Sequence, residues 1–128
     1  MKTKYTVALS MLAGVAIGAM AVQGLQAQGK PKAYSVSETE LTDATAQAAY
    51  TPLAQAAQRN AGARPLRTGG GKVVAIEGAA PPKRVAITEW DSLEQAQAFY
   101  NSAAWKDLAP QRDKGLKLIR RYVVEAMN

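Results

Sequence analysis

The sequence contains no cysteine and no histidine among its 128 residues. Without cysteine the chain forms no disulfide and no thiolate site, and without histidine it lacks the most frequent general base and metal ligand. A histidine-ligated haem and every catalytic triad that uses imidazole are excluded as well. No group of carboxylates has the spacing of a calcium loop. We therefore expect neither a metal site nor a cofactor.

The charge of the chain is positive but scattered. The sequence has 16 basic and 10 acidic residues, which gives a net charge of +6 at pH 7. It has no basic stripe with interleaved aromatic residues, which is the pattern of a nucleic-acid-binding surface. We expect solvated surface charge and no nucleic-acid partner.

The N-terminal segment has the pattern of a secretory signal peptide. Lys2 and Lys4 precede an uncharged apolar run, Val7–Val22, and a short exit segment ends at Ala27. This order is typical of signal peptides, and the run is shorter than the ~20 residues that span a bilayer. We expect residues 1–27 to be cleaved near Ala27 and the mature protein to be exported to the periplasm.

An uncleaved membrane anchor is the alternative for this segment. Gly14 and Gly18 have the GxxxG spacing that pairs helices within bilayers. On either interpretation, contact with the membrane is confined to the N-terminal segment.

The rest of the chain is expected to form one small domain behind a linker. Gly29 and Pro31 interrupt regular structure in the linker, residues 28–33, and the domain spans residues 34–126. The expected elements are, in order, strand 34–41, helix 43–61, strand 64–68, a turn at 69–71, strand 72–77, strand 84–90, a helix from Ser92, a helical turn at Trp105 and strand 117–125.

The two main helices have recognisable sequence signals. Asp43 is a suitable N-cap for the first helix, and Ser92 with Gln95 forms a capping box for the second. Pro52 is expected to kink or interrupt the first helix, and Gly62 to end it. Its buried stripe is expected to comprise Tyr50, Leu53, Ala57 and Ala61.

Two-residue alternation assigns faces to the strands. It groups Tyr34 and Val36 with Glu38 in the first strand, and Val85 and Ile87 with Glu89 in strand 84–90. In the last strand it groups Leu118, Tyr122 and Val124.

This element order predicts the fold class. The order β-α-β-β-α-β, with one extra hairpin strand, is the split βαβ pattern of ferredoxin-like α+β folds. Such an antiparallel sheet has its helices on one face only. The other face is partly apolar here, and a second copy of the same sheet is the simplest cover. We therefore expect a homodimer, a dimeric α+β barrel.

Several motifs strengthen this prediction because they resemble one family of small bacterial domains. The chain is similar to the family catalogued as domain of unknown function thirteen-thirty, within the dimeric α+β barrel superfamily. The resemblance covers about residues 34–125. The motifs that carry it are Glu38–Asp43, Gly62–Arg64, the glycines after Thr68, Ile87–Trp90, and Tyr100-Asn101-Ser102 with Trp105, Pro110 and Arg112.

The resemblance implies a ferredoxin-like dimer without an agreed reaction. Sister families in the superfamily include cofactor-independent monooxygenases, lactone isomerases and haem enzymes. The chain departs from the family pattern at Gln47 and Pro65, which replace aromatic residues. Thr68 replaces an arginine that commonly precedes the glycine pair, which puts any anion site built on that arginine in doubt.

Glu38 and Glu89 are the candidate catalytic residues. Each lies at the end of an otherwise apolar strand face, and a desolvated carboxylate has a raised pKa that suits a general base. The alternative is that each carboxylate pairs with an arginine or emerges into water at the end of its strand.

The candidate ligand-binding residues come from three groups. Arg64 and Arg112 offer planar guanidinium groups, either to a ligand carboxylate or to internal salt bridges. Tyr100, Asn101 and Ser102 either polarise a ligand carbonyl or end one helix, with Ser102 capping the next turn. Trp90 belongs either to a ligand site or to the core.

Three functions remain open from the sequence, and one of them is a stress-related structural protein without chemistry. The first is an exported homodimer that binds a small organic ligand in a cleft between sheet and helix. The alternative is a cofactor-independent enzyme resembling a monooxygenase or isomerase, in which a glutamate abstracts a proton and Tyr100, Asn101 or Arg112 stabilises the resulting anion.

Overall fold

A computed structural model of the chain describes residues 29–128. The expected signal segment, residues 1–27, therefore lies outside the described residues. The elements are β1 (Ala33–Leu41), α2 (Ala44–Asn60), β2 (Arg64–Pro65), β3 (Arg84–Trp90), α3 (Leu93–Tyr100), α4 (Ala103–Lys106), α5 (Ala109–Gly115) and β4 (Leu116–Glu125). Within residues 29–128, no helix has the length and apolar character needed to cross a bilayer.

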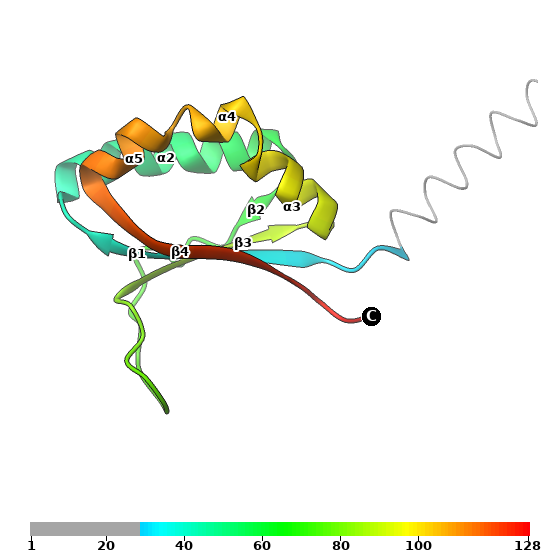
Figure 1. The fold of residues 1–128 in the computed structure, drawn as a ribbon, viewed down its shortest axis with the longest axis horizontal. Helices are drawn as coiled ribbons and strands as arrows, with labels where there is room; N and C mark the ends of the chain where they lie inside the picture. Colours follow the sequence, from blue (N-terminus) through cyan, green and yellow to red (C-terminus); the bar gives the residue numbers. More distant parts are fainter. Residues whose placement is uncertain (1–28) are drawn as a thin grey trace, which may run out of the picture. The chain divides into compact units, whose positions relative to one another are not determined.

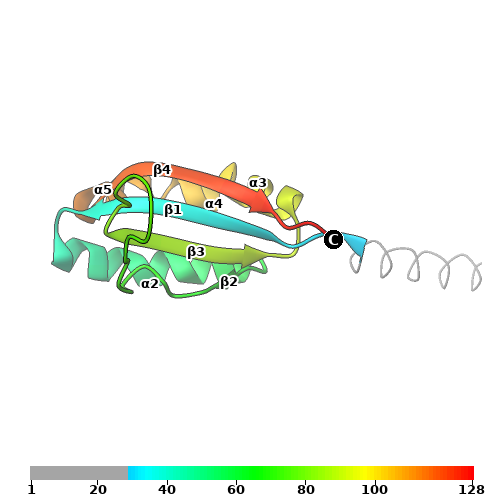
Figure 2. The same ribbon diagram turned by 90° about the horizontal axis from the view of Figure 1, so that it is seen from below.

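The four strands form one antiparallel sheet in the order β2-β3-β1-β4. Helices α2, α3, α4 and α5 lie on one face of this sheet, here called the helix face, and within residues 29–128 no helix covers the opposite, open face (Figures 1 and 2). The arrangement confirms the predicted ferredoxin-like α+β fold.

The strand faces follow from the pleat of β1. Ser35 and Thr39 are buried on the helix face, while Tyr34, Val36 and Glu38 point to the open face. A register shift between Glu38 and Thr39 marks a β-bulge in the pairing of β1 with β4.

Because of the bulge, the residues of β4 are distributed over the two faces of the sheet differently than expected. Leu118 pairs with Thr39 and so shares the helix face, whereas Tyr122 and Val124 pair with residues of the open face. The predicted grouping of Leu118 with Tyr122 and Val124 is therefore wrong, because one extra residue interrupts the two-residue period. The same bulge leaves Arg121, the partner of Ser37, on the helix face.

Helix α2 begins and ends where the sequence predicts. Asp43 accepts a hydrogen bond from the backbone N–H of Ala46 (2.9 Å), and Gly62 follows the helix with φ at 88°. The helix continues without a break through Pro52. Its buried residues are Tyr50, Ala54 and Gln58. Leu53 was expected in this stripe but is 43% exposed, because the inner face is rotated toward Ala54.

The predicted hairpin is absent. Strand β2 ends at Pro65, and Leu66 adds one further backbone bond to Ile87 (2.9 Å). The chain then turns at Arg67, whose φ of 61° lies in the left-handed region. Thr68 completes the edge through its side chain, which donates to Val85 O (2.7 Å) and accepts from Ile87 N (2.9 Å).

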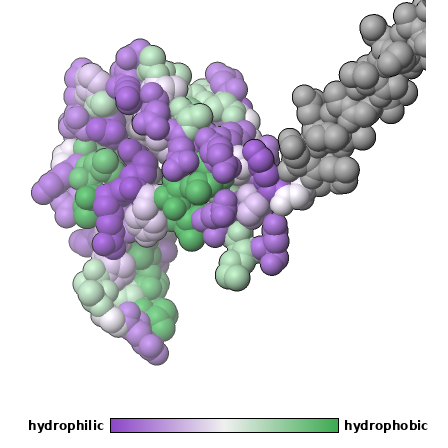
Figure 3. Space-filling view, turned by 45° about the vertical axis from the view of Figure 1, so that its right-hand side comes forward, coloured by the Kyte–Doolittle hydropathy of each residue, from purple (hydrophilic) through white to green (hydrophobic). Residues whose placement is uncertain are grey.

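Residues 72–77 do not pair as a strand. Residues 69–82, here called the arm, instead extend from the sheet on its open side (Figure 1). The arm exposes Val74 and Ile76, which are 62% and 85% exposed, and it shows apolar surface in Figure 3.

An aromatic cluster closes one half of the helix face. Trp90, Phe99, Tyr100 and Trp105 pack with ring centroids 5.0–5.7 Å apart. Ser35 anchors two of them, because its hydroxyl oxygen accepts from Trp90 Nε1 (2.9 Å) and from the Tyr100 hydroxyl (2.8 Å). The buried polar groups of the cluster are therefore hydrogen-bonded, as buried donors generally are.

Helices α2 and α5 meet at Gly115. Its carbonyl accepts from the backbone N–H groups of Thr42 (2.9 Å) and Asp43 (3.3 Å). A Cβ at position 115 would lie 2.4 Å from the backbone nitrogen of Gln47, so only glycine fits.

We expect Gly115→Ala to destabilise the domain by about 2–3 kcal/mol, as overpacking against backbone atoms does. Urea unfolding measures this loss. Gly70→Ala is the control, because no atom lies within 4 Å of a Cβ placed there. Equal stability of the two variants would contradict the close approach.

Candidate functional site

The two candidate catalytic carboxylates lie on the open face and are paired. Glu38 accepts a hydrogen bond from Arg120 Nε at 2.7 Å, and Glu89 accepts one from Arg64 Nε at 2.9 Å. Arg112 comes from α5, on the helix face. The structure therefore does not bring the two glutamates together with Arg112 in one cavity.

The surroundings of Glu38 oppose the function of a general base. The hydrogen bond from Arg120 lowers the pKa of the Glu38 carboxyl below its ordinary value, and this effect exceeds the raising effect of burial. A base that works near neutral pH needs the opposite shift.

The Tyr100-Asn101-Ser102 motif is a helix-ending turn. Tyr100 belongs to the aromatic cluster, and Asn101 is exposed as the C-cap of α3. Ser102 was expected to cap the following turn through its side chain, but its hydroxyl donates instead to the carbonyl of Phe99. None of these three residues lines the cavity described below.

Arg64 and Trp90 also make contacts within the protein instead of facing a ligand cavity. Arg64 forms ion pairs with Glu89 (2.9 Å) and Asp91 (2.8 Å), and Trp90 is 0% exposed in the core. Of the six predicted ligand-binding residues, only Arg112 lines the cavity.

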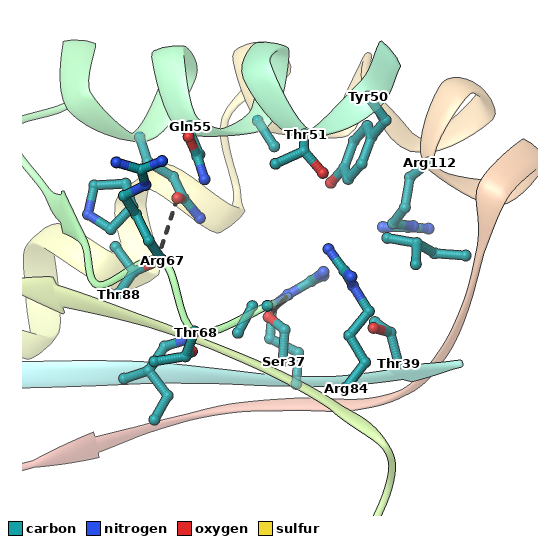
Figure 4. Close-up of a pocket in the computed structure, with 18 of the residues that line it drawn as sticks. Ser37, Thr39, Tyr50, Thr51, Gln55, Arg67, Thr68, Arg84, Thr88 and Arg112 are labelled. Carbon is teal, nitrogen blue, oxygen red and sulfur yellow. Dashed lines mark hydrogen bonds between the residues drawn. The ribbon is translucent and has the colours of Figure 1, made fainter. Parts of the chain in front are cut away.

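The cavity lies between α2 and the half of the helix face that the aromatic cluster leaves uncovered (Figure 4). Its volume is about 90 Å³. A single water needs roughly 10–15 Å³ by this measure, so the cavity has room for a small ligand. Ser37 and Thr39 contribute to its floor from β1, and Tyr50, Thr51 and Gln55 line it from α2.

Four arginines line this cavity, namely Arg67, Arg84, Arg112 and Arg121, and no aspartate or glutamate among the described residues does so. In Figure 4, Arg84 rises from the sheet and Arg112 reaches in from α5, both toward the space below Tyr50 and Thr51. Arg67 lies at the opposite end, where Gln55 is found. The lining is thus strongly positive.

Arg121 is held by an unusual set of partners. Its Nε donates to Ser37 Oγ at 2.8 Å, and its guanidinium carbon lies 4.7 Å from the ring centroid of Trp105 and 5.4 Å from that of Tyr100. Burial lowers the pKa of Arg121. Aromatic faces and a hydroxyl thus take the place of a carboxylate counter-charge.

The side chain of Arg84 has no hydrogen-bond or ion-pair partner within residues 29–128. Burial lowers its pKa, which reflects the cost of removing the charge from water without a counter-ion. Its side chain is therefore available to a ligand.

The remaining groups suit binding better than proton transfer. Arg112 directs Nε to Asp113 (3.0 Å), whose carboxylate is exposed. Burial raises the pKa of Tyr50 and outweighs the nearby arginines, so the phenol stays neutral and can donate a hydrogen bond. The cavity thus combines cations with neutral donors.

Arg84 and Arg121 have a signal in the sequence, although neither was predicted as a site residue. Arg84 alternates with Ala86, Thr88 and Trp90 and therefore shares their inward face. Arg121 alternates with Val123, which packs against the core. Charged residues at inward positions of two strands could have indicated the site.

Comparison with known proteins identifies the family. The family described as domain of unknown function (DUF1330) matches residues 32–127. The chain belongs to this family. This confirms the resemblance seen in the motifs, and the DUF1330 match spans the whole described domain except its ends. No match was found among curated proteins.

Solved structures share the fold of this DUF1330 domain. The RPA0582 protein of unknown function from Rhodopseudomonas palustris is 14% identical, with a TM-score of 0.60 over 77% of this chain and 85% of that one. SnoaB, a cofactor-independent oxygenase from Streptomyces nogalater, is 10% identical, with a TM-score of 0.50 over 77% of this chain and 95% of that one. At such identities the likeness concerns the fold alone.

Within residues 29–128, no three Asp or Glu side chains gather in an arrangement that could hold a metal ion.

Proposed function

We propose that this domain binds a small organic anion in the cavity between α2 and the sheet. The observation that carries the proposal is the presence of four arginines in one cavity, to whose lining no aspartate or glutamate of residues 29–128 contributes. An anion would supply the missing counter-charge.

The cavity without a ligand is electrostatically unfavourable. Guanidinium groups that are partly removed from water repel one another and lose hydration. Arg84 and Arg121 show this cost in their lowered pKa values. A carboxylate that accepts paired N–H bonds from a guanidinium offsets both effects. Ser37, Thr51 and Tyr50 can orient the remainder of the ligand.

The geometry favours binding over the enzyme alternative. A cofactor-independent oxygenase or isomerase must remove a proton from its substrate. The sequence has no histidine, and no carboxylate of the described residues lines the cavity. Both candidate bases, Glu38 and Glu89, are paired with arginines on the open face. The likeness to SnoaB concerns the fold alone and does not support an oxygenase function for this cavity.

A homodimer is the second part of the proposal. The open face exposes Ile119, Tyr122 and Val124. The carboxylates of Glu38 and Glu89 on this face are already neutralised by ion pairs. A two-fold axis through this face would place these three apolar side chains against the same side chains of a second copy, which an isologous dimer requires. The arm projects on the same side (Figure 1), so its exposed valine and isoleucine side chains would contact the second copy.

Export is the third part, and its basis is the sequence of residues 1–27 alone. The positive start, the apolar run and the exit at Ala27 support a cleaved signal peptide. The absence of cysteine is compatible with the periplasm but does not require it.

The first test measures anion binding by calorimetry. We expect propionate to bind and its neutral isostere propionamide not to bind. Arg84→Gln should weaken propionate binding by about tenfold or more, because a hydrogen bond to a charged group contributes ~1.5–3 kcal/mol. Arg59→Gln removes the same charge from an exposed site on α2 and should bind as the wild type does. Equal affinities of the two variants would contradict the proposal.

The second test measures oligomeric state by sedimentation equilibrium. We expect the mass of two chains for the wild type and of one chain for Val124→Glu, because a charge would be buried in the paired face. Leu53→Glu introduces the same charge at a similarly exposed position on α2 and should remain dimeric. A single-chain mass for the wild type would rule out the dimer.

The third test follows the full chain in cells. We expect it in the periplasmic fraction, with Gln28 as the first residue in N-terminal sequencing. Recovery from the membrane with residues 1–27 intact would favour the anchor instead, and a cytoplasmic location would refute export.

A further inference from the structure

Arg67 occupies a backbone conformation that glycine would adopt with less strain. Its φ of 61° makes it the single non-glycine residue with positive φ within residues 29–128. The left-handed region is unfavourable for residues with a Cβ. Residues held in such conformations often serve a site, and an observed outlier justifies asking which one.

Both neighbours of Arg67 are fixed to the edge of the sheet. Leu66 donates its backbone N–H to Ile87 O (2.9 Å), and the Thr68 hydroxyl bonds to Val85 and Ile87. The left-handed turn between these two anchors lifts Arg67 out of the sheet toward α2. The same contacts that strain the backbone therefore set the position of the guanidinium.

The Arg67 guanidinium lies apart from the other cations of the cavity. Figure 4 places it at the Gln55 end, whereas Arg84 and Arg112 point into the space below Tyr50 and Thr51. Arg67 makes no ion pair or hydrogen bond with residues 29–128, and it is exposed. The cavity thus has a cationic cluster at one end, a single cation at the other, and uncharged polar side chains between them.

We propose that the ligand is a short organic acid with two anionic groups, and that Arg67 binds the second group. This inference rests on the proposed function and extends it to a ligand class. One carboxylate lies among Arg84, Arg112 and Arg121, and the other reaches the exposed Arg67 at the opposite end of the cavity. The volume of about 90 Å³ restricts the link between them to a few carbon atoms.

The experiment compares succinate with monomethyl succinate, which has nearly the same size and only one charge. Calorimetry is carried out on the full chain at low ionic strength, because salt screens the interaction. We expect the wild type to bind succinate about tenfold more tightly than the monoester, since one further charged hydrogen-bond pair is formed.

Two substitutions separate the charge of Arg67 from its backbone. Arg67→Gln keeps the Cβ and removes the charge, and Arg67→Gly also removes the strain. We expect both variants to bind succinate and the monoester with equal affinity, at the monoester affinity of the wild type. We expect Arg67→Gly to melt at the same temperature as the wild type or higher, because glycine tolerates the left-handed turn.

The outcomes distinguish this inference from the function on which it rests. Equal binding of both compounds by the wild type, or a succinate preference retained in Arg67→Gln and Arg67→Gly, overturns the two-anion ligand and leaves anion binding intact. Failure of both compounds to bind the wild type overturns the two proposals together.

Discussion

The placement of Arg121 is the constraint on which the rest of the site depends. This guanidinium lies where the aromatic cluster ends and the cavity begins, against the rings of Trp105 and Tyr100 and bonded to Ser37. One half of the helix face is closed by aromatic rings in tilted and edge-to-face contact, and Ser35 accepts hydrogen bonds from Trp90 and Tyr100. The other half is lined by cations and hydroxyls. The packed core thus holds the wall of the cavity in place.

The two faces of the sheet have different electrostatic character. On the open face the carboxylates of Glu38 and Glu89 each have an arginine partner, and ion-paired carboxylates of this kind can be covered by another copy without isolating a charge. On the helix face four arginines line the cavity, and none of the carboxylates in the described part of the chain joins them there. A ferredoxin-like fold is compatible with many functions, so the function must be argued from this uneven distribution of charge.

The sequence predicted most of the fold because local signals and packing agree. The bounds of β3 and the cap of α2 were correct. The prediction of a hairpin was wrong because the chain makes a left-handed turn at Arg67, where the sequence has no glycine to indicate such a turn. Glu38 and Glu89 were each assigned to the apolar face of their own strand, and the structure places both on the side of the sheet opposite the cavity. Alternation within β3 and β4 could have shown Arg84 and Arg121 on the inward face, but their meeting with Arg67 and Arg112 in one cavity depends on tertiary packing, which no single segment of sequence reveals.

The most direct measurement of the central claim is side-chain NMR during a titration with a small carboxylate. The Nε–H signals of Arg84, Arg112 and Arg121 report on the cavity, and those of Arg64 and Arg120 report on the open face. We expect saturable shifts of the first three signals and constant positions for the other two. Shifts confined to Arg64 and Arg120, or no saturable shift of any of the five, would contradict anion binding in the cavity.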